Sequence, residues 1–109
     1  MITQTTTTDN GLATTVFAND YARLAVHTDT GLILSIDVPA EHRGEGHART
    51  IFEHAETIMD LYHVPAWGCT EDGLAFAEAM GGDTMDDQEA ADVLGLDLET
   101  VAPWLFDYA

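Results

Sequence analysis

A glycine-rich stretch near the middle of the chain, "RGEGHA" at residues 43–48, has the residue types of an anion site. Gly44 and Gly46 have no Cβ, so a ligand can come close to the backbone there. Arg43 and Arg49 are two of the three cationic Lys and Arg side chains in a chain of net charge −17. Where such a turn leads into a helix, free N–H groups and the helix dipole favour a phosphate. The alternative is a tight turn with two solvated arginines.

The neighbouring patterns predict that this turn joins a strand to a helix. Residues 32–38, "LILSIDV", alternate in the manner of a strand that is buried on one face. After the turn, apolar residues recur at i, i+3, i+4 and i+7, which predicts an amphipathic helix over residues 48–62. The apolar stripe of this helix consists of Ala48, Ile51, Phe52, Ala55, Ile58, Met59 and Tyr62.

The remaining patterns predict an α/β fold with a mixed sheet. Residues 12–19 and 21–28 read as strands, and a "DTG" turn connects them to the strand at 32–38, which gives an antiparallel meander. After the helix, residues 64–69 read as a further strand and residues 71–80 as a second helix, which two glycines end. A strand, helix and strand in this order predict a parallel crossover.

The two ends of the chain differ from its centre. Residues 1–11 are polar and Thr-rich, and we expect a disordered lead-in before a domain at residues 12–85. Residues 86–109 are expected to form an acidic helical extension. Within it, residues 87–105 have the spacing of a helix-turn-helix, but their acidic second helix has no cation with which to contact DNA.

An apolar cluster lies near the last residue, and we expect it to be buried. Large apolar side chains are seldom exposed together, so the cluster should pack on the chain's own core or in a homodimer contact. Its members are Trp104, Leu105, Phe106 and Tyr108.

The composition of the chain excludes some classes of partner and indicates a cellular compartment. The chain has 20 Asp and Glu residues against 3 cations, which argues against direct nucleic-acid binding. Such an acidic surface fits either adaptation to high salt, as in halophilic proteins, or imitation of a polyanion. The single Cys69 excludes an internal disulfide and fits a reducing compartment. With no readable signal peptide and no apolar run of ~20 residues, we expect a cytoplasmic protein without membrane contact.

The segment around the glycine turn resembles the acetyl-CoA-binding segment of the GNAT (Gcn5-related N-acetyltransferase) superfamily. That family's pattern is Arg or Gln, two residues, Gly, one residue, then Gly or Ala, and Arg43, Gly46 and Ala48 occupy those positions. The stretch "GLAFAEAMGG" at 73–82 is similar to the family's later helix. The resemblance implies a minimal GNAT-like domain that uses acetyl-CoA to acetylate an amine, which the acidic surface suggests is cationic.

The resemblance also implies where the cosubstrate binds. Acetyl-CoA would lie in a wedge between the strand at 32–38 and the strand near residue 65, with its pantetheine arm paired to the backbone around Ile36, Asp37 and Val38. A deprotonated amine would attack the thioester directly. The pyrophosphate would lie at the turn, whose residues are Arg43, Gly44, Glu45, Gly46, His47, Ala48 and Arg49.

Two side chains are catalytic candidates. Cys69 matches a cysteine near the second parallel strand of short acetyltransferase-like proteins, and its alternative role is that of a small buried hydrophobe. Asp37 would act as a base, or it is a solvated or capping aspartate. The chain departs from the family where Ala77 follows Phe76, because many members have there a tyrosine that protonates the departing thiol.

Two alternatives to acetyl transfer are a metal site and a non-catalytic role. His47 and His54 are seven residues apart on the expected helix, about 10 Å, which is too far for one metal ion. We therefore expect no metal site, and expect His42, His47 and His54 to be loop and helix-surface residues. The second alternative is a non-catalytic acidic interaction protein, a polyanion mimic or a regulator on the same scaffold.

Overall fold

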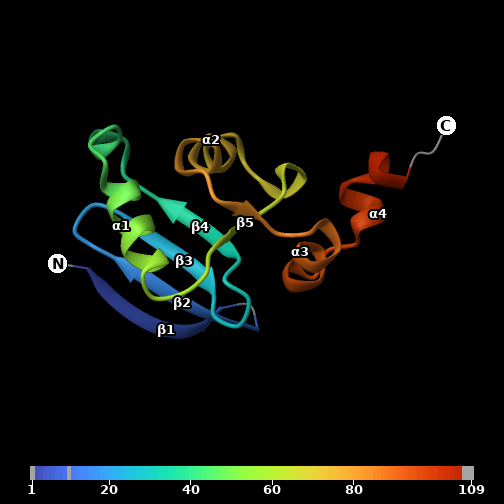
Figure 1. Cartoon of the computed structure of the whole chain (residues 1–109), viewed down its shortest axis with the longest axis horizontal. Coiled ribbons are helices and arrows are strands. Elements are labelled where there is room, and N and C mark those ends of the chain that lie inside the picture. The colour runs from blue at the N-terminus through green and yellow to red at the C-terminus, as the bar shows by residue number, and fades with distance from the viewer. Residues whose placement is uncertain (1, 10, 107–109) are drawn as a thin grey trace.

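The computed structural model describes residues 2–9 and 11–106, which form an α/β fold around a four-stranded antiparallel sheet (Figure 1). The strands run in sequence order across the sheet: β1 (Thr3–Asp9), β2 (Leu12–Ala18), β3 (Arg23–His27) and β4 (Ile33–Asp37). The antiparallel meander expected for the second to fourth of these strands is confirmed.

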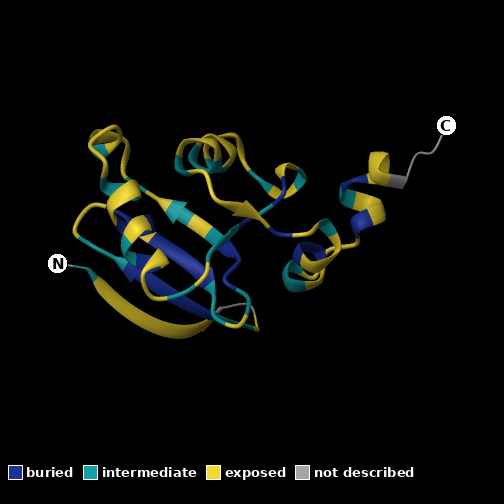
Figure 2. Ribbon diagram, in the orientation of Figure 1, coloured by how far each residue is buried: buried dark blue, intermediate teal, exposed yellow. Residues whose placement is uncertain are grey.

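Strand β1 corrects the expectation that residues 1–11 are disordered. It pairs with β2 along its whole length, from Thr3 opposite Ala18 to Asp9 opposite Leu12. The described side chains of β1 are exposed, as the edge strand in Figure 2 shows. Backbone hydrogen bonds and β-branched threonines hold this edge strand without a buried face, so its polar composition resembles that of a disordered segment.

Helix α1 (His47–Glu56) covers one face of the sheet and closes the main core. Ile51, Phe52 and Ala55 of the predicted apolar stripe are buried. They pack against residues of β2, β3 and β4, namely Phe17, Leu24, Val26 and Ile33.

The helix is shorter than the 48–62 that the periodicity predicted. The Thr57 hydroxyl donates to the His54 carbonyl 2.6 Å away, and the chain then leaves the helix. Ile58, an expected member of the stripe, is 48% exposed. The Tyr62 N–H donates to the Gly31 carbonyl at 2.9 Å, so the last expected helical residue belongs to a strand instead.

The second half of the chain begins with strand β5 (Tyr62–His63), which a parallel bridge between Leu32 and Tyr62 joins to the start of β4. The predicted strand at 64–69 is wrong: Pro65 has no N–H to donate to a ladder, and Ala66–Gly68 form a 3₁₀ turn. Helix α2 (Glu71–Met80) has the predicted bounds. Strand β6 (Asp83–Thr84) pairs with β5 in parallel.

The helix-turn-helix pattern is confirmed by α3 (Asp87–Leu94) and α4 (Leu98–Val101), which extend the molecule to 50 × 28 × 22 Å. Gly95 adopts a left-handed conformation, with φ 70°, at the turn between them. Trp104 is 60% exposed and Leu105 is also exposed, so their burial on the chain's own core is wrong and the homodimer contact stays a prediction. Tyr108 lies outside the described residues. Among the helices described, none is long and apolar enough to cross a lipid bilayer.

Candidate functional site

A cleft opens where β4 and β5 separate. The two strands are joined only near their starts, through the Leu32–Tyr62 bridge and the Tyr62 to Gly31 hydrogen bond. Beyond that point β4 continues toward the glycine turn, while the chain after β5 leads into α2, which is drawn above β4 in Figure 1. Two adjacent cavities of about 320 and 420 Å³ occupy this region. Both cavities are lined by Ile36, Arg43, Asp72 and Phe76.

The smaller, inner cavity contains both catalytic candidates. Asp37 at the end of β4 and Cys69 before α2 line it together, although 31 residues separate them in sequence. Asp37 is exposed, whereas Cys69 is half-buried. Ala77, the residue without a hydroxyl, also lines this cavity.

The Cys69 thiol is held in its protonated form. Its Sγ donates to the Val64 carbonyl at 3.2 Å, and burial raises the pKa of the thiol above its ordinary value. A thiol with a raised pKa is a weak nucleophile at neutral pH, because it keeps its proton.

His63 is a functional candidate that the sequence did not indicate. It is buried in β5, where it stacks on the ring of Phe52 and meets the ring of Phe76 edge to face, and it lines the inner cavity. Its Nε2 lies 2.7 Å from the Gly81 carbonyl. A carbonyl oxygen can only accept, so Nε2 carries the proton and Nδ1 of the neutral ring keeps a lone pair. A lone histidine in a two-residue strand gives no motif, so only the fold identifies it.

The outer cavity is bounded by the glycine turn and by α2. Gly44, Gly46, Ala48 and Arg49 line one side of it, and residues of α2 from Asp72 to Met80 line the other. Gly44 and Gly46 have φ near +80°, at 82° and 85°, and a Cβ on either would meet no atom within 4 Å. These glycines are therefore required by the backbone conformation of the turn, and the space above it is open.

The two arginines of the turn reach across to α2. The Arg43 Nε donates to the Val38 carbonyl at 3.1 Å, and its Nη1 lies 3.4 Å from the Asp72 carboxylate. The Arg49 Nη2 donates to the Ala79 carbonyl at 3.0 Å. Both guanidinium groups line the outer cavity and connect the turn to α2. Both are solvent-exposed, so a ligand can replace their contacts with α2.

Glu45 does not line either cavity, because it turns toward two histidines. Its Oε1 lies 3.1 Å from His42 Nδ1 and 3.0 Å from His47 Nε2. The hydrogen bond with His47, followed by that with His42, lowers the pKa of the Glu45 carboxyl. His42 lies in a 3₁₀ turn and His47 at the start of α1, and both are half-buried. The argument against a shared ion concerned His47 and His54 and does not apply to this pair.

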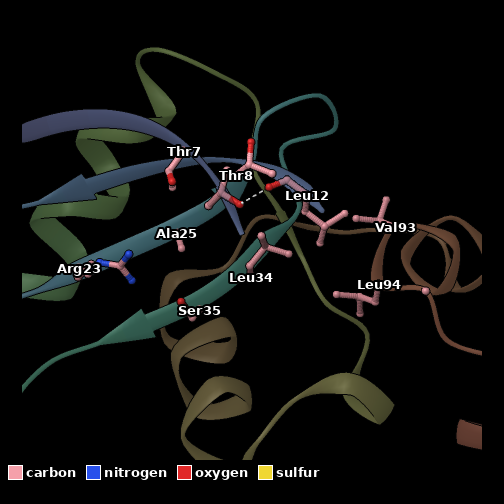
Figure 3. A pocket seen from close by; sticks show the side chains of 11 residues that line it. Thr7, Thr8, Leu12, Arg23, Ala25, Leu34, Ser35, Val93 and Leu94 are labelled. Atoms are coloured by element: carbon pink, nitrogen blue, oxygen red, sulfur yellow. Dashed lines mark hydrogen bonds between the residues drawn. The ribbon is translucent and has the colours of Figure 1, made fainter. Parts of the chain in front are cut away.

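A larger cavity of about 720 Å³ lies where the sheet meets α3 (Figure 3), and it shares Leu34 and Ser35 of β4 with the lining of the inner cavity. Threonine hydroxyls and aliphatic side chains line it, including Thr8, Leu34 and Val93. Its charged group is Arg23. Among the described residues that line it, none is a cysteine, a histidine or a carboxylate, whereas the cleft between β4 and α2 contains all three types.

No protein-family model matches the chain, and neither the curated proteins nor the solved structures include a significant match.

Proposed function

We propose that the protein is an acyl-CoA-dependent N-acetyltransferase with a GNAT-like arrangement, and that it acetylates a cationic amine. The observation that carries the proposal is the separation of β4 from β5 beside the glycine turn. The cleft so formed has anion-binding features at one end and proton-transfer groups at the other. The resemblance of the turn to the GNAT acetyl-CoA-binding segment likewise implies that the pyrophosphate binds at the turn and the acetyl group farther along the cleft.

The outer cavity suits the pyrophosphate of acetyl-CoA. Gly44 and Gly46 leave the turn uncovered, and the N-terminus of α1 carries free N–H groups and positive potential. Arg43 and Arg49 border the same space. From there the pantetheine arm would extend along Ile36, which lines both cavities, toward the inner one.

The inner cavity suits the acetyl group and the amine. Exposed Asp37 would attract the cationic amine, and the unprotonated Nδ1 of His63 would accept a proton from it, directly or through water. The amine nitrogen then forms a bond to the thioester carbon and loses its second proton to water, and the bond from that carbon to sulfur breaks. Ala77 has no proton to give, so Cys69 would protonate the leaving thiolate. Cys69 would then recover its proton from solvent.

Thiol release from acetyl-CoA, measured together with mass spectrometry of the amine, tests this function. The full chain is assayed with polyamines, aminoglycosides and lysine-containing peptides, at low salt and at molar salt. We expect one thiol for each acetylated amine. Thiol release without an acetylated amine, or no release under any condition, contradicts acetyl transfer. A non-catalytic acidic interaction protein would give the second result.

A further inference from the structure

Three metal-ligating side chains come together at the glycine turn, and two of them, His42 and His47, also line the outer cavity. His42 Nδ1 and His47 Nε2 approach the same Glu45 oxygen at 3.1 and 3.0 Å. One ligand atom from each of the three residues lies within 4.8 Å of the other two. Once the ion displaces the protons on these two nitrogens, two imidazoles and a carboxylate around one point are a ligand set that transition metals prefer.

We propose that His42, Glu45 and His47 bind one divalent transition-metal ion, for which Zn²⁺ is the best match. Ligands at Zn²⁺ bond lengths in a tetrahedron are about 3.4 Å apart. The two separations to Glu45 are slightly shorter than this, so small side-chain rotations would admit the ion. Mg²⁺ and Ca²⁺ fit poorly, because they prefer oxygen ligands. Three protein ligands leave a coordination position for water or an anion.

The turn itself brings the three residues together. His42 ends the 3₁₀ turn Ala40–His42, Glu45 lies in the loop, and His47 is the first residue of α1. Gly44 and Gly46, both at positive φ, bend the chain between these ligands so that the side chains converge. The same two glycines that open the turn to an anion therefore also bring the three ligands together.

Tyr21 restricts the two imidazole rings. Its ring centroid lies 4.6 Å from that of His42 and 4.3 Å from that of His47, on which it stacks. The Tyr21 backbone N–H donates to the Asn19 Oδ1 at 2.8 Å, which fixes the connection between β2 and β3. Packing against Tyr21 limits the rotamers of the two rings, so less side-chain entropy is lost when the ion binds.

Two electrostatic effects oppose each other at this site. The positive end of α1 and the nearby Arg43 disfavour a cation. Against this, the Arg43 charge is paired with Asp72, Glu45 supplies a carboxylate as ligand, and the net charge of −17 raises the local concentration of cations. The Glu45 carboxylate would contact the ion directly, whereas the helix dipole acts from farther away. We therefore expect the attraction to exceed the repulsion and the ion to bind.

The experiment is a calorimetric titration of Zn²⁺ into the metal-free full chain, in a buffer that does not chelate metals. We expect one ion per chain. Because loss of an outer-sphere partner already weakens metal binding 10–100-fold, His42→Ala, His47→Ala and Glu45→Gln should each weaken it by at least about 100-fold. His54→Ala and Glu53→Gln make the same chemical changes elsewhere on α1, and they should leave the affinity unchanged.

Co²⁺ provides a readout that does not depend on heat. Bound by His42, Glu45 and His47, it should give visible absorption bands of a low-coordinate site, and these should be absent in His47→Ala. Circular dichroism confirms that each variant is folded, and His47→Gln replaces His47→Ala if the latter melts early. No Zn²⁺ binding by the wild type, or equal weakening by His54→Ala, overturns the proposal. Either result would leave an ordinary hydrogen-bonded cluster. The inference does not rest on the proposed acetyl transfer.

Discussion

The Arg43 guanidinium lies 3.4 Å from the Asp72 carboxylate and so joins the glycine turn to the first turn of α2 across the cleft. Both side chains line both cavities. The proposed phosphate site needs the positive charge of Arg43, and Asp72 is already paired with it. Since both groups are solvent-exposed, the pair is weak, and an incoming pyrophosphate can replace Asp72 as the partner of Arg43.

Asp72→Asn should therefore raise the affinity for CoA. The change removes a negative charge from the cleft and releases Arg43, and calorimetry with CoA measures the gain. Glu71→Gln is the matched control, because it makes the same charge change at the neighbouring exposed position of α2. Equal effects of the two variants would mean that only net charge matters, and would contradict a role for the Arg43–Asp72 pair.

Gly31→Ala should destabilise the protein strongly, because Gly31 is where β5 is joined to the sheet. A Cβ there would lie 2.0 Å from the Asp60 carbonyl oxygen, and φ is +80°. We expect a loss of roughly 3 kcal/mol or more in the free energy of unfolding, from clash and backbone strain together. Gly11→Ala shares the positive φ but meets nothing within 4 Å, so it should cost only about 1 kcal/mol.

Urea denaturation of both variants measures the difference. Similar free energies of unfolding for Gly31→Ala and Gly11→Ala would show that the close approach of Asp60 to Gly31 does not define the start of the cleft.

The Cys69 thiol should react slowly with iodoacetamide in the folded protein. Burial raises its pKa, so at neutral pH the folded state holds less thiolate than the unfolded chain does, and the thiolate appears only as the pH rises through the higher value. Alkylation rates across pH 7–10, followed by mass spectrometry in buffer and in urea, test this. An inflection at or below about 8.5 in the folded protein would contradict the assignment of Cys69 as a proton donor.

Several elements were predictable because their signals are local. The bounds of α2 follow from Thr70, whose hydroxyl accepts from the Gly73 N–H, and from Gly81 after the last turn. The turn between α3 and α4 follows in the same way from Gly95 in its left-handed conformation. The meander was readable because alternation and turn residues lie close together in sequence.

Other features depend on pairing across the chain and left no local signal. Strand β5 is two residues long and exists because Tyr62 bonds to Gly31, so no window of sequence marks it. The inner cavity brings His63 of β5 to the same space as Asp37 and Cys69. Likewise, Tyr21 reaches His42 only in the folded chain.

Ala77→Tyr should increase the rate of acetyl transfer. The new phenol would enter the inner cavity, which Ala77 lines, and supply a proton to the departing thiolate. A positioned general acid contributes about 10²–10⁴-fold, and because Cys69 already supplies part of this, we expect about a tenfold gain in kcat. Ala77→Phe adds the same bulk without the hydroxyl, so it should not accelerate the reaction. An equal change in both variants would point to packing and remove the proton-donor argument.

The most direct test of acetyl transfer at this cleft is a titration of acetyl-CoA into three forms of the chain: wild type, Gly46→Glu and Gly11→Glu. The two variants each add a carboxylate at an exposed glycine of positive φ, one in the turn and one remote from it. We predict that the wild type and Gly11→Glu bind one acetyl-CoA each with similar affinity. Gly46→Glu should lose binding, because its carboxylate would repel the pyrophosphate. Equal binding by all three forms, or binding by none, would contradict the account.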